Sequence, residues 1–337
     1  MKKNILLSNL SIILLTYNKN YWLKKSINYW SQFNVDLVVV DGSEEKPNDM
    51  YSIKKDSLCK LRYFHEIGSY YERLLFASKL SLRKYVLMSC DDEIHLIKGV
   101  LKSIKFLEND NNLVASIGRC LKISINSQNQ FKEEIIYKRF EKVNNMIAAN
   151  DMKKRIFNYF EEYICASYYS VIRSKAWKKN LKYICRLKIS SPYVYERLIE
   201  LSHISQGRIY VHNNISWIRN GIIPPKMKSR SRRINWWLKN KNLSHEHSEV
   251  LNAIKKITNL RSENYSMFNH IFRDKKVNSW INIKLFLMDF KIFIKIKGLI
   301  NKILSNNQLT KKTTILKESD FLKSSEINEI NNFLKTY

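Results

Sequence analysis

Short apolar runs alternate with segments of helical spacing along the first third of the chain. The apolar runs are LSIILL, VDLVVV and YVLMS, at residues 10–15, 35–40 and 85–89. Strands buried on both faces of a parallel sheet are almost continuously apolar, whereas half-exposed strands alternate apolar and polar residues. Parallel strands also need a helix-length connection between them. The pattern therefore predicts an α/β fold, with a mostly parallel sheet that carries helices on both faces.

The alternation continues to about residue 220 and is followed by the pair Pro224-Pro225. Because consecutive prolines cannot continue a helix or a central strand, we place the end of the core domain there. We expect a core domain over residues 1–223, with halves of about 1–120 and 121–223. A basic, mainly helical region over residues 224–337 is expected to follow it.

The N-terminal sequence MKKNILLSNLSIILL has the lysine-then-apolar order of a signal peptide. However, four polar residues interrupt its apolar run, and no small-residue cleavage site follows. We therefore expect a first strand ending at Leu15 instead. No charge-free apolar stretch reaches the roughly 18 residues of a membrane span, and the five cysteines include no C-x-x-C pair. These features are typical of a cytoplasmic protein with reduced thiols.

Three carboxylates, Asp91, Asp92 and Glu93, follow the apolar run 85–89 directly. Like charges repel one another, and burying them costs several kcal/mol unless a positive group compensates. One interpretation is a solvated turn in which one carboxylate caps the next helix. The other is a site for Mg²⁺ or Mn²⁺, hard cations that share carboxylate oxygens with substrate phosphates. The triplet alone leaves both interpretations open.

Polar residues also end the two preceding strands, at Thr16 to Asn18 and at Asp41 to Ser43. Ligands of open parallel sheets bind outside the carboxyl ends of the strands. We therefore expect these two clusters to meet the acidic triplet 91–93 in one crevice.

Taken in order, these motifs resemble a known enzyme family. The chain resembles the nucleotide-sugar half of inverting, family 2-type bacterial glycosyltransferases of GT-A fold. The motifs that carry this resemblance are T-Y-N at 16–18, V-x-D-G-S at 39–43, His65 with Arg73, and the acidic triplet 91–93. The likeness is good over about 10–120 and looser over 160–220. It implies transfer of a sugar, with inversion, from a nucleotide-diphosphate sugar to a glycan or lipid-linked glycan. In such bacteria the product belongs to surface polysaccharide or lipopolysaccharide.

The resemblance assigns donor-binding roles residue by residue. Thr16, Tyr17 and Asn18 match the loop that packs the nucleotide base and ribose, and Asp41 matches the acceptor of hydrogen bonds from the base. Arg73 matches an arginine that pairs with the diphosphate or braces the triplet.

Asp91 and Glu93 match the first and third positions of the D-x-D-type metal motif, with Asp92 as a further donor-binding residue between them. The implied cofactor is Mg²⁺ or Mn²⁺, although the family usually has Asp where this chain has Glu93. Arg219, which follows a later strand, is assigned to the phosphates.

An inverting transferase also needs a general base for the acceptor hydroxyl. The family keeps an acidic residue on a helix in the second half of the domain. Here the segment YVYERLIELSHISQG contains Glu196, the best match, and Glu200 one helical turn later as the alternative base.

The remaining features concern partners. Lys and Arg number 59 against 30 Asp and Glu, a net charge of +29, which attracts any polyanion. The alternative to the enzyme is a membrane-surface or nucleic-acid-binding protein with a degenerate transferase fold. Of these two partners, nucleic acid is disfavoured because the acidic triplet would repel it. The lysine-rich apolar helix expected over 279–304 suits an anionic membrane surface, the core domain or a second subunit of a homo-oligomer. If that helix lies on an anionic membrane, the protein is expected on the inner face of the plasma membrane.

Overall fold

The structure is a computed structural model that describes residues 2–46, 57–125, 131–135, 149–161, 167–220, 234–260, 264–272 and 328–329. One compact unit comprises Met1–Phe272 with Glu318–Tyr337, and Arg273–Lys317 form another. The helix expected over 279–304 lies outside the described residues. Within the described part of the chain, no helix is both long and apolar enough to cross a membrane.

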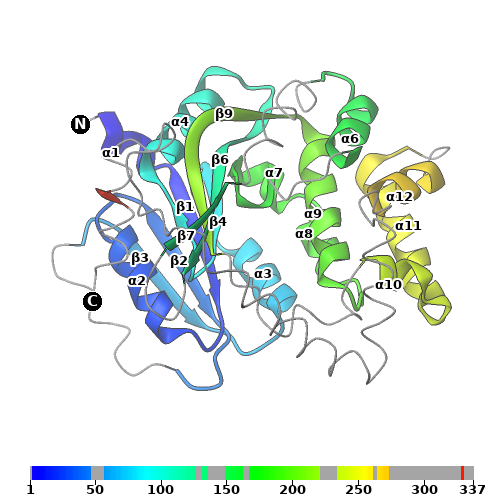
Figure 1. The fold of residues 1–337 in the computed structure, drawn as a ribbon, viewed down its shortest axis with the longest axis horizontal. Coiled ribbons are helices and arrows are strands. Elements are labelled where there is room, and N and C mark those ends of the chain that lie inside the picture. The colour runs from blue at the N-terminus through cyan, green and yellow to red at the C-terminus, as the bar shows by residue number, and fades with distance from the viewer. Residues whose placement is uncertain are drawn as a thin grey trace, which may run out of the picture. The chain divides into compact units, whose positions relative to one another are not determined.

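Four parallel strands form the first half of the sheet (Figure 1). They are β1 (Leu10–Thr16), β2 (Asp36–Asp41), β3 (Lys60–His65) and β4 (Tyr85–Ser89), in the spatial order β3-β2-β1-β4. The connections include α2 (Asn20–Trp30) and α3 (Tyr70–Lys79). The strand ending expected at Leu15 extends by one residue, and a short helix, α1 (Lys2–Leu7), precedes it.

The second half of the sheet is mixed. Its strands are β5 (Ile94–His95), β6 (Leu113–Ile125), β7 (Phe131–Ile135), β8 (Val171–Arg173) and β9 (Arg208–Asn220). Strand β8 lies between β4 and β6 and is antiparallel to both, whereas β9 runs parallel to β6. The short β8 therefore joins the two halves into one continuous sheet.

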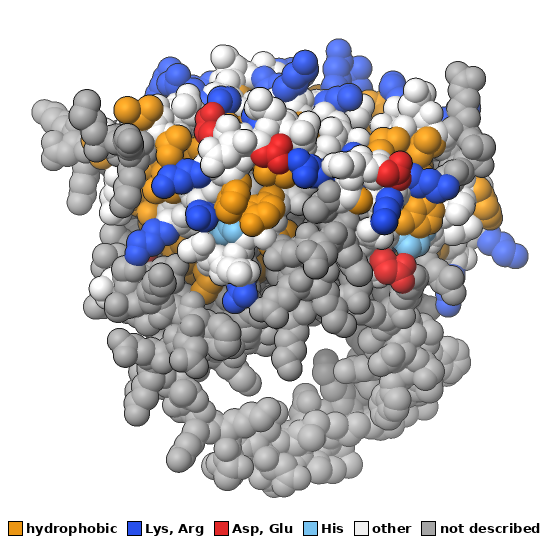
Figure 2. All heavy atoms as spheres, turned by 90° about the horizontal axis from the view of Figure 1, so that it is seen from above, with side chains coloured by type: hydrophobic (Ala, Val, Ile, Leu, Met, Phe, Trp, Pro, Cys, Tyr) orange, Lys and Arg blue, Asp and Glu red, His pale blue; other side chains and the backbone are white. Residues whose placement is uncertain are grey.

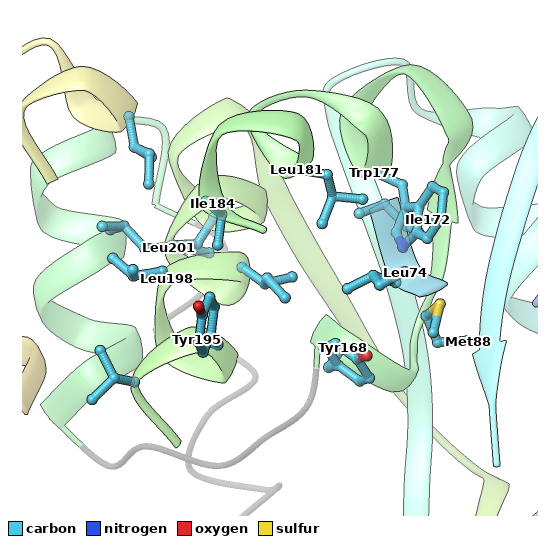
Figure 3. Packing of buried hydrophobic residues seen from close by; sticks show 14 of the residues in the cluster. Leu74, Met88, Tyr168, Ile172, Trp177, Leu181, Ile184, Tyr195, Leu198 and Leu201 are labelled. Atoms are coloured by element: carbon cyan, nitrogen blue, oxygen red, sulfur yellow. The ribbon is translucent and has the colours of Figure 1, made fainter. Parts of the chain in front are cut away.

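Helices cover both faces of this sheet, as the apolar runs predicted. Ile13 and Val38 belong to a core cluster that includes Leu74 of α3 and residues of the helices that follow β8. Figure 3 shows part of this cluster, with Leu74 near Ile172 and Trp177. The alternate residues of the same strands, such as Ile12 and Leu37, are equally buried. Helices α2 and α4 (Ile97–Asn109) supply buried apolar side chains outside that cluster, so they cover the opposite face. The α/β class is thus confirmed.

Helix α9 (Pro192–Gln206) is the centre of the second half. It begins with proline in its first turn and is capped by Gly207, directly before β9.

Other helices of this half are α6 (Met152–Glu161), η1 (Ser167–Tyr169), α7 (Ser174–Lys178) and α8 (Leu181–Ile184). Those of the C-terminal region are α10 (Ile234–Lys239), η4 (Lys241–Leu243), α11 (Ser244–Thr258) and α12 (Asn264–Phe272). Helices α11 and α12 pack beside α9 (Figure 1), so the first helices of the basic region belong to the same compact unit. The boundary at residue 223 itself stays a prediction.

A contact distant in sequence closes this unit. The carboxylate of Glu329 accepts a hydrogen bond from the backbone N–H of Ile97 at 2.7 Å and another from the hydroxyl of Tyr29. Ile97 is the first residue of α4, whose N-cap residue, Leu96, has no side chain that could cap the helix. Glu329 therefore satisfies an N–H at the positive end of the helix dipole.

Candidate active site

The strand register brings the predicted polar clusters to one edge of the sheet. Thr16 at the end of β1 pairs with Asp41 at the end of β2, and Asp41 pairs with His65 at the end of β3. Ser89, the last residue of β4, pairs with Leu14, so the acidic triplet begins just beyond the same edge. The hydroxyl of Thr16 donates a hydrogen bond to Oδ2 of Asp91 at 2.7 Å.

Lys19 connects two members of the triplet. Its Nζ donates to Asp91 Oδ1 at 3.1 Å and to Asp92 Oδ2 at 2.7 Å. The Lys19 side chain is 38% exposed, whereas that of Asp91 is 6% exposed. Burial alone would lower the pKa of Lys19, but the two carboxylates outweigh it and raise that pKa. Burial raises the pKa of Asp91, and Lys19 opposes this shift.

The loop after β2 is held by Asp41. Its Oδ1 accepts from the backbone N–H of Ser43 at 2.8 Å and its Oδ2 from the hydroxyl of Tyr63 at 2.7 Å. The Ser43 hydroxyl in turn accepts from the N–H of Asn18 at 2.9 Å, and Asn18 has a left-handed φ of 52°. Asp41 is fully buried, so in this structure it orders the two loops. The ring of Tyr17 beside them is 45% exposed and is the accessible part of T-Y-N.

Arg73 is buried at the same edge. A capping box of Ser69 and Glu72 starts helix α3 one turn earlier, and this directs Arg73 toward the ends of β1 and β2. The guanidinium donates to the carbonyl oxygen of Thr16 and packs against Gly42, where an added Cβ would lie 2.6 Å from Nε. Burial lowers the pKa of Arg73, and its Nε has no hydrogen-bond partner within the described part of the chain.

Glu93 takes a different direction from Asp91 and Asp92. The indole N–H of Trp217 donates to Glu93 Oε2 at 2.9 Å, and the indole ring stacks on Tyr169 with a centroid separation of 4.2 Å. Sequence reasoning did not find Trp217, because its position on β9 is remote from every motif.

The donor set fits a divalent cation only in part. Among the residues described, no group of three or more His, Cys, Asp and Glu side chains is arranged to hold a metal ion. Asp91 and Asp92 nevertheless face one cation already, the ammonium of Lys19. Mg²⁺ commonly takes only one or two carboxylates and completes its shell with water and substrate phosphates. The Asp91–Asp92 pair fits that pattern, whereas a ligand role for Glu93 stays a prediction.

The two candidate bases on α9 have different surroundings. Glu200 is fully buried; it accepts from the backbone N–H of Tyr168 at 2.8 Å and from the hydroxyl of Tyr159. Burial raises the pKa of Glu200 to about 8. Glu196 is half-buried. The pKa of the Tyr71 phenol on α3 is raised by its burial first, then by Tyr70 and then by Glu196, so Glu196 lies close to that phenol.

Aromatic contacts join α9 to the strand-end cluster. Tyr71 stacks on Tyr195, the neighbour of Glu196, with a centroid separation of 3.7 Å. The hydroxyls of Tyr70 and Tyr168 are hydrogen-bonded. Glu196 therefore lies beside the helix that carries Arg73. The backbone of Arg219 belongs to β9, and its side chain lies outside the described residues.

Comparison with known proteins supports the fold. No family model matches the sequence, and neither does any curated protein. The structure of S. aureus TarS 1–349 in complex with UDP-GlcNAc matches with a TM-score of 0.51 and 13% identity, over 78% of this chain and 71% of that one. A second TarS 1–349 structure gives a TM-score of 0.45 and 15% identity, over 78% of each chain. The first match shows that this chain shares the α/β fold of that structure, with a mostly parallel sheet and helices on both faces.

Proposed function

We propose that this protein is a glycosyltransferase that moves a sugar, with inversion, from a nucleotide-diphosphate sugar to a glycan or lipid-linked glycan of the bacterial surface. The observation that carries the proposal is the meeting of Thr16, Arg73, Asp91 and Lys19 at the carboxyl edge of a GT-A-like sheet. That edge is where open α/β sheets bind ligands. UDP-GlcNAc in the matching TarS structure supports a nucleotide sugar as the donor class.

At the donor, Tyr17 offers an exposed ring face for the nucleotide base, next to the loops ordered by Asp41. Asp91 and Asp92 would hold Mg²⁺ or Mn²⁺ together with the donor phosphates. When bound there, the cation supplies positive charge for the leaving diphosphate. The guanidinium of Arg73 adds a fixed positive charge at the same edge.

At the acceptor, we assign Glu196 as the general base. The acceptor hydroxyl attacks the anomeric carbon, its proton passes to the Glu196 carboxylate, and the bond to the diphosphate oxygen breaks with its electron pair on the diphosphate. Glu200 is a poorer base, because it is fully buried and both of its oxygens already accept hydrogen bonds.

The competing ligand for so basic a chain is nucleic acid. Binding of a polyanion usually relies on a stripe or patch of Lys and Arg. Over the described part of the face in Figure 2, basic side chains are interspersed with acidic and apolar ones and form no single stripe. The acidic edge of the sheet, which would repel a polyanion, favours the transferase over the nucleic-acid binder.

Calorimetric titration with UDP, GDP, dTDP and CMP, each with and without Mn²⁺, tests the proposal. We expect one nucleotide to bind the wild type, and the Asp91→Ala variant to bind it at least about tenfold more weakly, since the proposed cation site loses one of its two carboxylates. Binding of none of the four would contradict the proposal. With the donor known, NMR of the product's anomeric centre tests inversion, and Glu196→Gln should abolish turnover but retain donor binding.

A further inference from the structure

The ammonium of Lys19 occupies the position between Asp91 and Asp92 that a cation would take. It lies 3.1 Å from Asp91 Oδ1 and 2.7 Å from Asp92 Oδ2. Asp91 is in turn fixed by the Thr16 hydroxyl at 2.7 Å and, through its backbone carbonyl, by the Ser26 hydroxyl at 2.8 Å. Asp91 is therefore held in place by the fold, and Lys19 supplies the positive counter-charge of both carboxylates.

Lys19 itself is less firmly held than the groups it pairs with. Its backbone is fixed, because it is the residue before α2 and its carbonyl accepts from the N–H of Leu23 at 3.0 Å. Its side chain, however, is 38% exposed, against 6% for Asp91 and 20% for Asp92. An ammonium has three N–H donors on a flexible four-carbon chain. Two point to the carboxylates, and the third has no partner among the residues described.

The local charge favours exchange of this cation when the donor binds. Asp91 and Asp92 bring two negative charges against the single positive charge of Lys19, and a diphosphate adds more negative charge. Coulomb attraction grows with the charge of the cation, so a divalent cation offsets the excess better than one ammonium. Arg73 is buried at the same edge, and its Nε has no hydrogen-bond partner among the described residues. Its guanidinium therefore retains an N–H donor that a diphosphate could accept from.

We propose that Lys19 is an exchangeable internal cation: it neutralises Asp91 and Asp92 in the free protein, gives way to a divalent metal, and then pairs with the donor diphosphate. The inference rests on the proposed function and adds to it a residue that competes with the metal and cooperates with the nucleotide. Because metal must displace Lys19, metal alone binds weakly, and metal with nucleotide binds tightly. One substitution at this position should therefore shift the two affinities in opposite directions.

The test uses the full chain in four forms: wild type, Lys19→Met, Lys19→Arg, and Lys105→Met as the matched control. Lys105 is exposed on α4, so its variant makes the same change of net charge away from the triplet. Free Mn²⁺ is counted by EPR as metal is added without nucleotide. UDP is then titrated calorimetrically at saturating Mn²⁺, and melting temperatures establish that each variant is folded.

We expect Lys19→Met to bind Mn²⁺ alone at least about fivefold more tightly than wild type and to bind UDP about tenfold more weakly. Lys19→Arg should restore the wild-type Mn²⁺ affinity, and Lys105→Met should match wild type in both titrations. Equal Mn²⁺ affinity in Lys19→Met and wild type would overturn the exchange. Tighter Mn²⁺ binding without loss of UDP affinity would overturn the pairing with the diphosphate. If the wild type binds no nucleotide of the panel, the proposed function fails, whereas the Mn²⁺ titration alone still decides the competition.

Discussion

Asp91 and Glu200 are both buried carboxylates, yet their partners differ in kind. Asp91, at the edge of the parallel half of the sheet, is paired with the partly exposed ammonium of Lys19. Glu200, in the middle of α9, accepts from the Tyr159 hydroxyl and the Tyr168 backbone N–H, two buried and neutral donors. Asp91 can exchange its partner for a ligand from solvent, whereas Glu200 cannot.

The difference separates the carboxylate that we propose as a cation ligand from a structural carboxylate, although a raised pKa alone would not. Burial raises the pKa of both groups. Perturbed acids gather at functional sites, but structural networks shift pKa values as well. The exposure of the partner is the property that distinguishes them here, since Lys19 is 38% exposed whereas Tyr159 is buried.

The largest effect is expected from Glu200→Ala. The substitution leaves the Tyr159 hydroxyl and the Tyr168 N–H buried without an acceptor, at about 1–3 kcal/mol each. Urea denaturation should show this loss in the free energy of unfolding. The matched control is Glu196→Ala on the same helix, where we expect a smaller loss because the side chain is only half-buried. Equal losses in the two variants would remove the distinction between the two regions.

The stability of the second half should also depend on pH through Glu200. Its pKa is about 8 in the folded protein and about 4.5 when unfolded, so the folded state holds a proton that the unfolded state has lost between these values. Stability is then fully present below about pH 4.5 and falls by up to about 1.4 kcal/mol per pH unit as pH rises toward 8. Denaturation of wild type and Glu200→Gln from pH 5 to 9 measures this. The variant should show the shallower decline, and parallel curves would contradict the assignment.

A smaller effect is expected at the donor edge from Gly42→Ala. The new Cβ would lie 2.6 Å from Arg73 Nε and 2.8 Å from its Cζ, so the guanidinium must move away from the Thr16 carbonyl. Overpacking of this kind costs about 1–3 kcal/mol, and nucleotide affinity should fall with it. Calorimetry of donor binding checks the change, and the melting temperature establishes that the variant is folded. Unchanged binding would place Arg73 outside the donor site.

The smallest effect is expected from Thr16→Val, which keeps the shape of the side chain and removes one hydrogen bond to Asp91. The free energy of unfolding should fall by about 1 kcal/mol. Denaturation measures it, and calorimetry should show nucleotide affinity reduced only a few-fold, because the Ser26 hydroxyl still holds the backbone carbonyl of Asp91. A loss as large as that of Glu200→Ala would mean that the donor edge is as rigid as the core of α9.

The sequence was sufficient for the elements whose pattern is local. Continuous apolar runs located β1, β2 and β4, and their polar ends were expected at one edge because parallel strands share their direction. The antiparallel insertion of β8 could not be predicted, since a three-residue strand leaves no periodic signal. Nor could the partners of the triplet: Trp217 is 124 residues from Glu93.

Position explains the remaining differences at the candidate site. Glu196 and Glu200 are one turn apart and resemble each other in sequence, but only packing against η1 and α6 buries Glu200. Lys19 follows T-Y-N directly and was overlooked because a lysine at a helix start usually lies in solvent. The ordered motifs indicated at which edge of the sheet a ligand is expected to bind. Which side chains pair with one another at that edge depends on contacts that only the fold creates.

The cap that Glu329 places on α4 has a consequence for synthesis. Ile97 and Glu329 are 232 residues apart, and Tyr29 and Glu329 are 300 apart. The strands and helices of the first half leave the ribosome long before the residue that completes their helix cap has been translated. A nascent chain must therefore hold α4 with the N–H of Ile97 unsatisfied by Glu329 until residue 329 has been translated, and a truncation that removes Glu329 acts on the N-terminal half of the fold.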